Sequence, residues 1–193
     1  MNVLVGMCCG GEIKYRTVLS LLGLLGETPV GAVSIQSGGY KPFNMNKLVE
    51  EAKKVDATHL MSIDADMIFP ADGLERLLGA DKDIVGANYR FRGVLADQDT
   101  PASVIKFEGK DGYRNVLEPD FPKELFECGA VGLGFTLIKM SVFDKLKKPY
   151  FYIKEDPLPS TEDIVFCQDA RKAGIKIFCD PTIKMGHYGS YVY

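Results

Sequence analysis

Apolar runs and helically spaced apolar residues alternate along the first half of the chain. The apolar runs are short, as in buried strands, and cover residues 2–7, 31–37, 59–64 and 83–91. The segments with helical spacing lie between them and cover residues 13–25, 46–55 and 70–80. This order of strands and helices predicts a parallel sheet with helices on both faces.

The second half of the chain has a less regular pattern. It predicts a hairpin with its turn at Asp111-Gly112, a strand, a short helix, an aromatic loop, a longer helix and a final strand pair. These elements cover residues 107–116, 130–139, 141–148, 149–160, 161–174 and 175–187. We interpret the loop 149–160 as a lid, and the alternative is a surface loop with its aromatic side chains packed inward. No linker or repeat interrupts the pattern, so we predict a single domain over residues 1–193 with two functional halves.

Small and polar residues follow three of the predicted strands. The segments are "MCCGGE" after the first strand, "QSGGY" after the second and "DADM" after the third. Ligands of open parallel sheets bind beyond the carboxyl ends of the strands. We therefore expect a nucleotide to bind where these three segments meet.

Two carboxylates stand out within the apolar stretch "LMSIDADMIFP". Asp64 and Asp66 are two residues apart, so on an extended strand both side chains leave the same face. Carboxylates held this close repel one another unless a proton or a cation lies between them. A divalent metal with hard oxygen ligands, Mg²⁺ or Mn²⁺, resolves the conflict. The alternative is a solvated strand end in which Asp66 starts a turn.

One of the two histidines lies at the end of the predicted final strand. His187 is in "MGHYG", and it is a candidate third metal ligand from a distant strand end. The alternative is an ordinary surface or core histidine. His59 precedes an apolar strand, so we interpret it as structural.

An acidic pair begins the predicted helix of residues 161–174. Ser160 and Asp163 fit a capping box, and acidic residues in a first turn complement the helix dipole. Capping alone would explain both Glu162 and Asp163. A carboxylate fixed at a helix start is also suited to act as a general base, and the two roles are compatible.

The ordered combination of these motifs resembles the GT-A glycosyltransferases. The likeness is to the inverting family 2 type, in the small single-domain versions of viral and bacterial genomes. The matching segments span nearly the whole chain, and they are "SIDADMIFP", "GAVGLGF", "STEDIVFCQDARKAGIKIFCDP" and "MGHYG". The resemblance implies an α/β fold with a Rossmann-like, nucleotide-binding mixed sheet flanked by helices. Residues 1–92 would form the nucleotide-sugar-binding half, and residues 93–193 the acceptor and catalytic half.

The resemblance also implies a role for each matching residue. Asp66 would bind the metal directly, Asp64 would contact the ribose or the metal through water, and His187 would complete the metal and diphosphate site. Asp163 would be the base that deprotonates an acceptor hydroxyl, with Glu162 supporting it. Candidate contacts to the donor nucleotide or sugar are Met7, Cys8, Cys9, Gly10, Gln36, Ser37, Asn46, Gly132 and Gly134. The implied activity is metal-dependent, inverting transfer of a hexosyl group from a nucleoside-diphosphate sugar.

Composition and charge limit the classes of protein, and the cellular locations, that fit this chain. The net charge of -3 argues against a strongly basic nucleic-acid-binding protein, and no apolar stretch has the length of a membrane span. Five cysteines without a CxxC pair suggest a reduced chain, so we expect a cytoplasmic location, or the host cytoplasm for a viral protein. The chain has no tryptophan, which excludes the Q-x-x-R-W motif of processive polysaccharide synthases.

The residues, taken without the resemblance, also allow two other functions. One is a nucleotidyltransferase-like enzyme, which also needs paired carboxylates and Mg²⁺, and the other is a non-catalytic sugar-nucleotide-binding protein. The sequence does not distinguish between a saccharide, a protein and a modified nucleic-acid base as the acceptor. Self-association of the chain is also left open. Candidate contacts for a phosphate-bearing acceptor are Tyr89, Arg90, Arg92 and Arg114.

Overall fold

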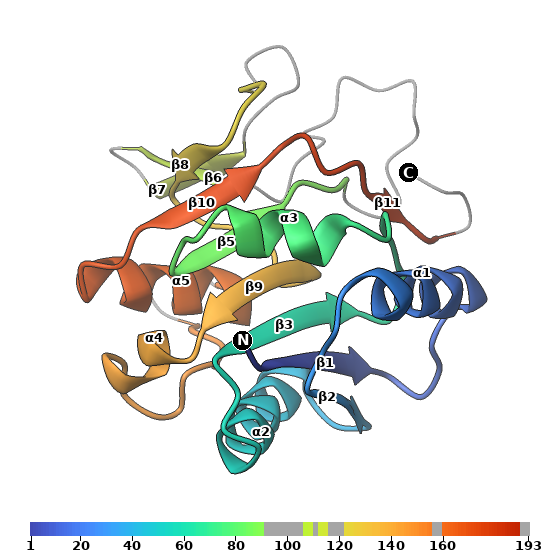
Figure 1. Cartoon of the computed structure of the whole chain (residues 1–193). Coiled ribbons are helices and arrows are strands. Elements are labelled where there is room, and N and C mark those ends of the chain that lie inside the picture. Colours follow the sequence, from blue (N-terminus) through green and yellow to red (C-terminus); the bar gives the residue numbers. More distant parts are fainter. Residues whose placement is uncertain (91–105, 110–111, 116–121, 156–159, 190–193) are drawn as a thin grey trace.

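A mixed sheet with helices on both faces forms the centre of the molecule (Figure 1). The computed structural model describes residues 1–90, 106–109, 112–115, 122–155 and 160–189. The strands are β1 (Val3–Cys9), β2 (Ala32–Ser37), β3 (His59–Asp64), β4 (Met67–Ile68), β5 (Ile84–Ala87), β6 (Lys106–Gly109), β7 (Gly112–Asn115), β8 (Phe126–Cys128), β9 (Phe135–Lys139), β10 (Ile177–Asp180) and β11 (Gly186–His187). The helices are α1 (Tyr15–Glu27), α2 (Lys41–Lys54), α3 (Gly73–Gly79), α4 (Ser141–Asp144) and α5 (Glu162–Lys172).

The main sheet has seven strands in the order β2-β1-β3-β9-β5-β10-β8. β1 pairs in parallel with β2 and β3, as the alternating pattern predicts. β9 then pairs antiparallel with both β3 and β5, so the purely parallel order predicted for the first half is wrong at this point. The mixed sheet implied by the resemblance is confirmed. Because β9 lies between β3 and β5, the two halves of the chain share one sheet, and their separate functional roles stay a prediction.

Two apolar clusters cover the two faces of the sheet. On one face, Leu4 and Leu60 pack with buried residues of α2, α4 and α5. On the other face, Val5 and Met61 pack with buried residues of α1 and α3. Burying an apolar side chain of this size contributes about 1.5–3 kcal/mol. This burial on both faces explains why the central strands read as continuous apolar runs.

Several element boundaries differ from those predicted. α2 begins at Lys41 rather than at residue 46, because Pro42 is well accommodated in the first turn of a helix. The capping box is wrong as well, because Thr161 is the N-cap of α5 and Ser160 forms a bridge with Lys154. β9 begins at residue 135 instead of 130. The β6–β7 hairpin is confirmed, but the predicted turn at Asp111-Gly112 is wrong in its second residue, because Gly112 belongs to β7 and pairs with Gly109. Asp111 lies outside the described residues.

The predicted final strand pair separates into two sheets. β10 joins the main sheet beside β5, whereas β11 pairs antiparallel with β4 in a small sheet of its own. Register in the small sheet places His187 opposite Met67. The end of the described chain is thereby joined to the segment that follows the two aspartates.

The first part of the aromatic loop is anchored to the core. Tyr150 and Phe151 are buried, and the ring of Phe151 stacks on Phe166 with centroids 4.7 Å apart. The hydroxyl of Tyr152 donates to Asp169 over 2.8 Å. These aromatic side chains pack inward, as in the alternative to a lid, and residues 156–159 lie outside the described part of the chain.

None of the helices in the described ranges has both the length and the apolar content to cross a membrane. All five cysteines are free thiols. Cys128, Cys167 and Cys179 are buried, so these three serve as small apolar core residues.

The contact between β5 and β9 leaves no room for a side chain at Gly86. A Cβ there would lie 2.5 Å from Thr136 Oγ1 and 3.4 Å from the carbonyl oxygen of Phe135. We expect Gly86→Ala to lower the free energy of unfolding by about 1–3 kcal/mol, measured by urea denaturation. The control is Gly79→Ala, where a Cβ meets nothing within 4 Å. Equal stability of the two variants would contradict close packing between β5 and β9.

Candidate active site

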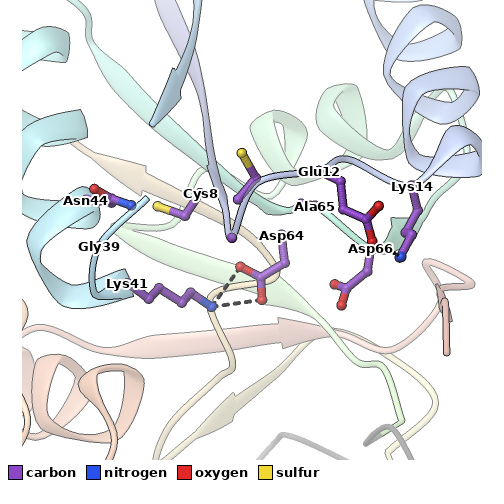
Figure 2. A pocket seen from close by; sticks show the side chains of 11 residues that line it. Cys8, Glu12, Lys14, Gly39, Lys41, Asn44, Asp64, Ala65 and Asp66 are labelled. Atoms are coloured by element: carbon purple, nitrogen blue, oxygen red, sulfur yellow. Dashed lines mark hydrogen bonds and ion pairs between the residues drawn. The ribbon is translucent and has the colours of Figure 1, made fainter. Parts of the chain in front are cut away.

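A cavity of about 460 Å³ opens at the carboxyl ends of β1, β2 and β3 (Figure 2). It lies where the sequence predicts a ligand for a parallel sheet. Its lining residues come from the ends of β1 and β3, the loops after β1, β2 and β3, and the start of α2, and they are Cys8, Cys9, Gly10, Glu12, Lys14, Gly39, Lys41, Asn44, Asp64, Ala65 and Asp66. Charged side chains of both signs make it a polar site.

Glycines shape the rim of this cavity. Gly38 and Gly39 have φ angles of 70° and 74°, a region that glycine enters without steric cost. The turn is held by the N–H of Gly38, which donates to the carbonyl of Cys9, and by the Asn44 side chain, which donates to the carbonyl of Gly38 over 2.6 Å. This turn directs the chain into α2 and places Lys41 at the cavity.

Lys41 binds the first aspartate of the D-x-D pair. Its Nζ lies 2.7 Å from Oδ1 and 2.8 Å from Oδ2 of Asp64 (Figure 2). The same Nζ lies 3.6 Å from Oε1 of Glu162. The exposed fractions of the three side chains are 32%, 21% and 13%, so water screens these contacts only in part. One ammonium group therefore offsets the charge of two carboxylates from distant parts of the chain.

The pKa values of these groups reflect their enclosure. Burial on its own would lower the pKa of Lys41, but Asp64, Tyr89 and Glu162 together outweigh it and raise that pKa above its usual range. Burial raises the pKa of Glu162 despite the opposing effect of Lys41. Burial likewise raises the pKa of Cys8 to about 12, so its thiol stays protonated at neutral pH. Lys41 is thus a fixed positive charge, and the Cys8 thiol is uncharged.

The second aspartate lies beside His187. The Nε2 of His187 is 3.4 Å from Oδ1 of Asp66, and both side chains are largely buried. The backbone N–H of Tyr188 also donates to the carbonyl of Asp66 over 2.7 Å. The β4–β11 pairing therefore brings together two of the residues for which the sequence predicts a metal site.

Two contacts orient the His187 ring. Its Nδ1 lies 2.7 Å from the carbonyl oxygen of Arg90, which can only accept, so Nδ1 carries the proton. The ring also meets Tyr89 edge-on with centroids 5.4 Å apart. In the neutral ring, Nε2 then has a free lone pair directed toward Asp66. Histidines that bind metals are commonly fixed in this way.

The two aspartates do not act as one unit in the structure. β3 ends at Asp64, and Ala65 and Asp66 form a turn, so the expected extended D-x-D geometry is wrong. Asp64 faces Lys41 and Asp66 faces His187. Among the residues that the structure describes, no group of three His, Cys, Asp or Glu side chains is placed to hold a metal. The Asp66–His187 pair supplies two suitable ligands, which fits a metal that is also held by substrate phosphates.

Asp163 lies in the first turn of α5. Its carboxylate accepts from the N–H of Ile164 over 2.8 Å and from the hydroxyl of Thr161. The buried Tyr89 has a raised pKa, caused mainly by burial and then by Asp64, with Asp163 contributing. Asp163 is therefore within electrostatic reach of the site, on the same side as Glu162.

Comparison with known proteins identifies the fold. No protein-family model and no curated protein matches the chain. Among solved structures, A197 from STIV is 19% identical with a TM-score of 0.68, over 98% of this chain and 87% of A197. GalNAc-T7, crystallised with UDP, GalNAc and Mn²⁺, is 12% identical with a TM-score of 0.58. That match covers 97% of this chain and 44% of GalNAc-T7, so the chain spans less than half of that protein. The fold is GT-A-like.

Within the GT-A-like fold, the predicted nucleotide contacts divide into two groups. Cys8, Cys9 and Gly10 line the cavity, whereas Met7 is fully buried in the core. Gln36 and Ser37 pair in register with Cys8 and Cys9 but are not among the lining residues. Their position next to the cavity results from the parallel pairing of β1 with β2.

Asn46, a predicted nucleotide contact, does not line the cavity and instead forms hydrogen bonds within the protein. Its amide donates to the carbonyl of Phe151 over 2.7 Å and accepts from the N–H of Tyr150 over 2.8 Å. These bonds fasten the start of the aromatic loop to α2. Asn44, two residues earlier in the helix and so on nearly the opposite side, lines the cavity instead.

Of the two glycines before β9, Gly134 contacts the site through its backbone. The carbonyl of Gly134 accepts from the N–H of Asp64 over 3.0 Å, and its own N–H donates to the Tyr89 hydroxyl over 2.9 Å. A Cβ at Gly134 would lie 2.6 Å from that hydroxyl oxygen. The carbonyl of Gly132 accepts from the Thr136 hydroxyl.

Among the predicted acceptor contacts, Tyr89 and Arg90 flank His187, and the side chains of Arg92 and Arg114 lie outside the described residues.

Sequence reasoning missed Lys41, Glu12 and Lys14. Lys41 follows the strand of residues 31–37 and the Gly38-Gly39 turn, and that strand ends at the ligand edge. The position of Lys41 near the ligand could therefore have been predicted from the sequence. The N–H of Lys14 donates to the carbonyl of Ala65, which joins the loop after β1 to the D-x-D turn. The ion pair between Lys14 and Glu12 at the rim has no sequence signal beyond their spacing.

The Lys41–Asp64 contact is testable by a double-mutant cycle. We expect Lys41→Met and Asp64→Asn to be coupled by about 1–2 kcal/mol in urea denaturation, because each single change leaves an enclosed charge without its partner. The matched control is the Lys54–Glu51 pair at 2.8 Å, whose side chains are 68% and 40% exposed. Its coupling should not differ measurably from zero. Equal coupling in the two cycles would contradict a special role for Lys41.

Proposed function

We propose that the chain is a metal-dependent, inverting glycosyltransferase that transfers a sugar from a nucleoside-diphosphate sugar to an acceptor hydroxyl. The observation that carries the proposal is the placement of Asp66 beside His187 at the donor cavity, with their facing atoms 3.4 Å apart. Such a pair suits a divalent ion that is shared with phosphate oxygens. The GT-A-like fold supports it, since a structure of that fold was crystallised with UDP, GalNAc and Mn²⁺.

The donor would occupy the cavity at the ends of β1, β2 and β3. Its base and ribose would lie against Cys8, Cys9 and Gly10, and its diphosphate toward Lys41 and Asp66. Lys41 has three N–H donors, so it can hold Asp64 and still donate to a phosphate oxygen. We assign to it the role of a fixed counter-charge for the diphosphate. Asp64 would keep the ammonium group in place and contact the ribose.

Asp66 and His187 would hold the metal together with the diphosphate. When bound, the metal would offset the negative charge that grows on the departing nucleoside diphosphate. A nitrogen ligand favours Mn²⁺ over Mg²⁺, because Mg²⁺ is selective for oxygen. The Arg90 carbonyl, by holding the proton on Nδ1, keeps Nε2 available to the metal.

Asp163 would act as the general base. As the acceptor oxygen bonds to the anomeric carbon, the bond from that carbon to the diphosphate breaks, and the acceptor proton passes to the Asp163 carboxylate. Attack from the side opposite the leaving group inverts the stereocentre. Glu162 has a raised pKa because of burial, so it would support the site as a hydrogen-bonding partner of the acceptor.

The two alternative functions make different demands on the residues. A nucleotidyltransferase-like enzyme needs positive charge for a triphosphate, and at the cavity Lys14 is already paired with Glu12. A non-catalytic sugar-nucleotide-binding protein would need Lys41, Asp64 and Asp66 but not Asp163. The acceptor, whether a saccharide, a protein or a modified nucleic-acid base, is left open by the proposal.

Nucleotide binding should depend on metal. In a thermal-shift screen of nucleoside diphosphates and their sugars, we expect one base to raise the melting temperature with Mn²⁺ and not in its absence. At a ligand concentration 100 times Kd, the added stability would be roughly 2.7 kcal/mol. The shift with Mn²⁺ should be lost in His187→Ala and kept in His59→Ala, since His59 lies at the far end of β3.

A shift of equal size with and without metal would contradict the metal site. No shift with any donor, in either condition, would overturn the proposed function as a whole.

Asp163→Asn tests catalysis separately from binding. The amide oxygen can still accept from Ile164, so the helix start should stay intact. We expect turnover to fall about 10²–10⁴-fold while the donor-induced thermal shift is retained. Turnover is measured as release of nucleoside diphosphate with the donor identified above. Unchanged turnover would restrict Asp163 to its role in the first turn of α5.

A further inference from the structure

Exposed apolar side chains gather along one border of the molecule. Among the described residues, most of the large ones with high exposure come from α1, β2 and the start of α2. We define the edge surface as five of the members on α1 and β2, which are Val18, Leu19, Leu22, Val33 and Ile35, and leave out Tyr15 of α1 because its ring meets Tyr188 edge-on. Their exposed fractions run from 39% to 61%. Single exposed apolar residues are ordinary, but a continuous group of them marks an interaction site.

The β2 part of the edge surface continues an apolar stripe of the core. Parallel register places Val33 beside Val5 and Ile35 beside Met7, so all four side chains leave the same face of the sheet. Val5 and Met7 are fully buried in the cluster that includes Leu24 of α1. Val33 and Ile35 are 41% and 48% exposed. The helix thus covers this face over β1 and leaves it open over β2.

Val18 and Leu22, two of the three α1 residues of the edge surface, lie on the side of the helix away from β4, whereas Leu19 lies nearer to Gly23. Ser20 accepts from the N–H of Phe69, and a Cβ at Gly23 would lie 3.4 Å from Cβ of Ala71, so that side of α1 faces the segment after β4. Val18 and Leu22 lie roughly opposite Ser20 and Gly23 at about 100° per residue. They therefore face the border formed by β2. A helix with apolar residues on more than its core-facing side is usually covered there too.

The β2 edge is open and uncharged. β2 is the terminal strand of the seven-stranded sheet, so one side of its backbone has no strand partner in the described structure. Residues 28–40 contain no charged side chain, in a chain where charged residues make up 25%. Edge strands are normally protected from pairing by charges, proline, bulges or a covering segment. The strand itself, "AVSIQS", has neither charge nor proline.

We propose that a second copy of this chain covers the edge surface, with β2 of each copy paired antiparallel across a two-fold axis. A two-fold axis places each residue of the surface against the same surface of the partner. Charged residues within that surface would therefore face like charges and repel one another. The uncharged segment 28–40 meets that condition. A lipid surface would cover the apolar side chains but would leave the strand edge without hydrogen-bond partners. A second copy satisfies both the backbone and the apolar face.

Pairing at β2 would also act on the donor cavity. β2 leads directly into the Gly38-Gly39 turn and Lys41, and the turn is tied to Cys9 at the end of β1. Holding β2 between two strands would limit the movement of this rim. The proposal does not rest on the proposed function, because dimerisation is measured without any donor.

The mass in solution tests the interface. Light scattering after size exclusion should give twice the 21.3 kDa of the chain. Val33→Lys should weaken the dimer about a hundredfold, because each copy loses an apolar contact and brings a charge to the axis. The matched control is Val55→Lys, which changes a valine of nearly equal exposure, 40% against 41%, outside the edge surface. That variant should remain dimeric.

Two further measurements separate the interface from misfolding and from other occupants. Leu22→Lys, at a side chain 60% exposed, should also dissociate the dimer, and both variants should keep the wild-type circular dichroism spectrum. In wild type, amide exchange in peptides from residues 32–37 should slow as protein concentration rises. A wild-type mass of 21.3 kDa at every concentration would overturn the proposal, as would a dimer that Val33→Lys and Leu22→Lys leave intact. Flotation of the chain as a monomer with phosphatidylglycerol vesicles would assign the surface to lipid instead.

Discussion

The antiparallel pairing of β9 with β3 and β5 is the constraint on which the site depends. It brings the carbonyl of Gly134 to the N–H of Asp64 and the N–H of Gly134 to the Tyr89 hydroxyl, so one glycine connects the end of β3 to the segment after β5. Tyr89 then meets the ring of His187, which lies beside Asp66. A Cβ at Gly134 would lie 2.6 Å from the Tyr89 hydroxyl oxygen, and one at Gly86 would lie 2.5 Å from Thr136 Oγ1, so neither position has room for a side chain. The positions of Asp64 and His187 therefore depend on this pairing.

Electrostatics explains how a chain of modest net charge keeps several carboxylates at one cavity. Lys41 contacts both oxygens of Asp64 and lies near Glu162, so the repulsion among them is offset within the protein. Asp66 is separated from that group and faces a histidine. The site thus has an ammonium end and a carboxylate–imidazole end. In the proposed function, a diphosphate with a metal would be complementary to both, because its oxygens could accept from the first and its metal could be held by the second.

Much of the fold could be predicted from the sequence because local patterns determine it. Apolar runs identified β1, β2 and β3, and helical spacing identified α1 and α5. The insertion of β9 could not be predicted, since a buried strand has the same apolar pattern in a parallel and an antiparallel place. The ends of the elements were predicted less accurately than the elements themselves. For example, α2 begins five residues earlier than its periodicity suggests, because Pro42 is accommodated in its first turn. Lys41 was missed because its role depends on a carboxylate that is distant in sequence.

The order of strands and helices along the chain fixes which side chains can meet at the ligand edge. It places Cys8, Cys9 and Asp64 at the carboxyl ends of their strands, whatever the rest of the chain does. How the charged residues pair depends instead on contacts between distant parts of the chain. Asp64 pairs with Lys41 because a glycine turn directs α2 into the cavity, and Asp66 lies beside His187 because β11 pairs with β4. The physical reason is that charges and hydrogen bonds act over a few ångströms, and residues distant in the chain come within that range only when the strands pair.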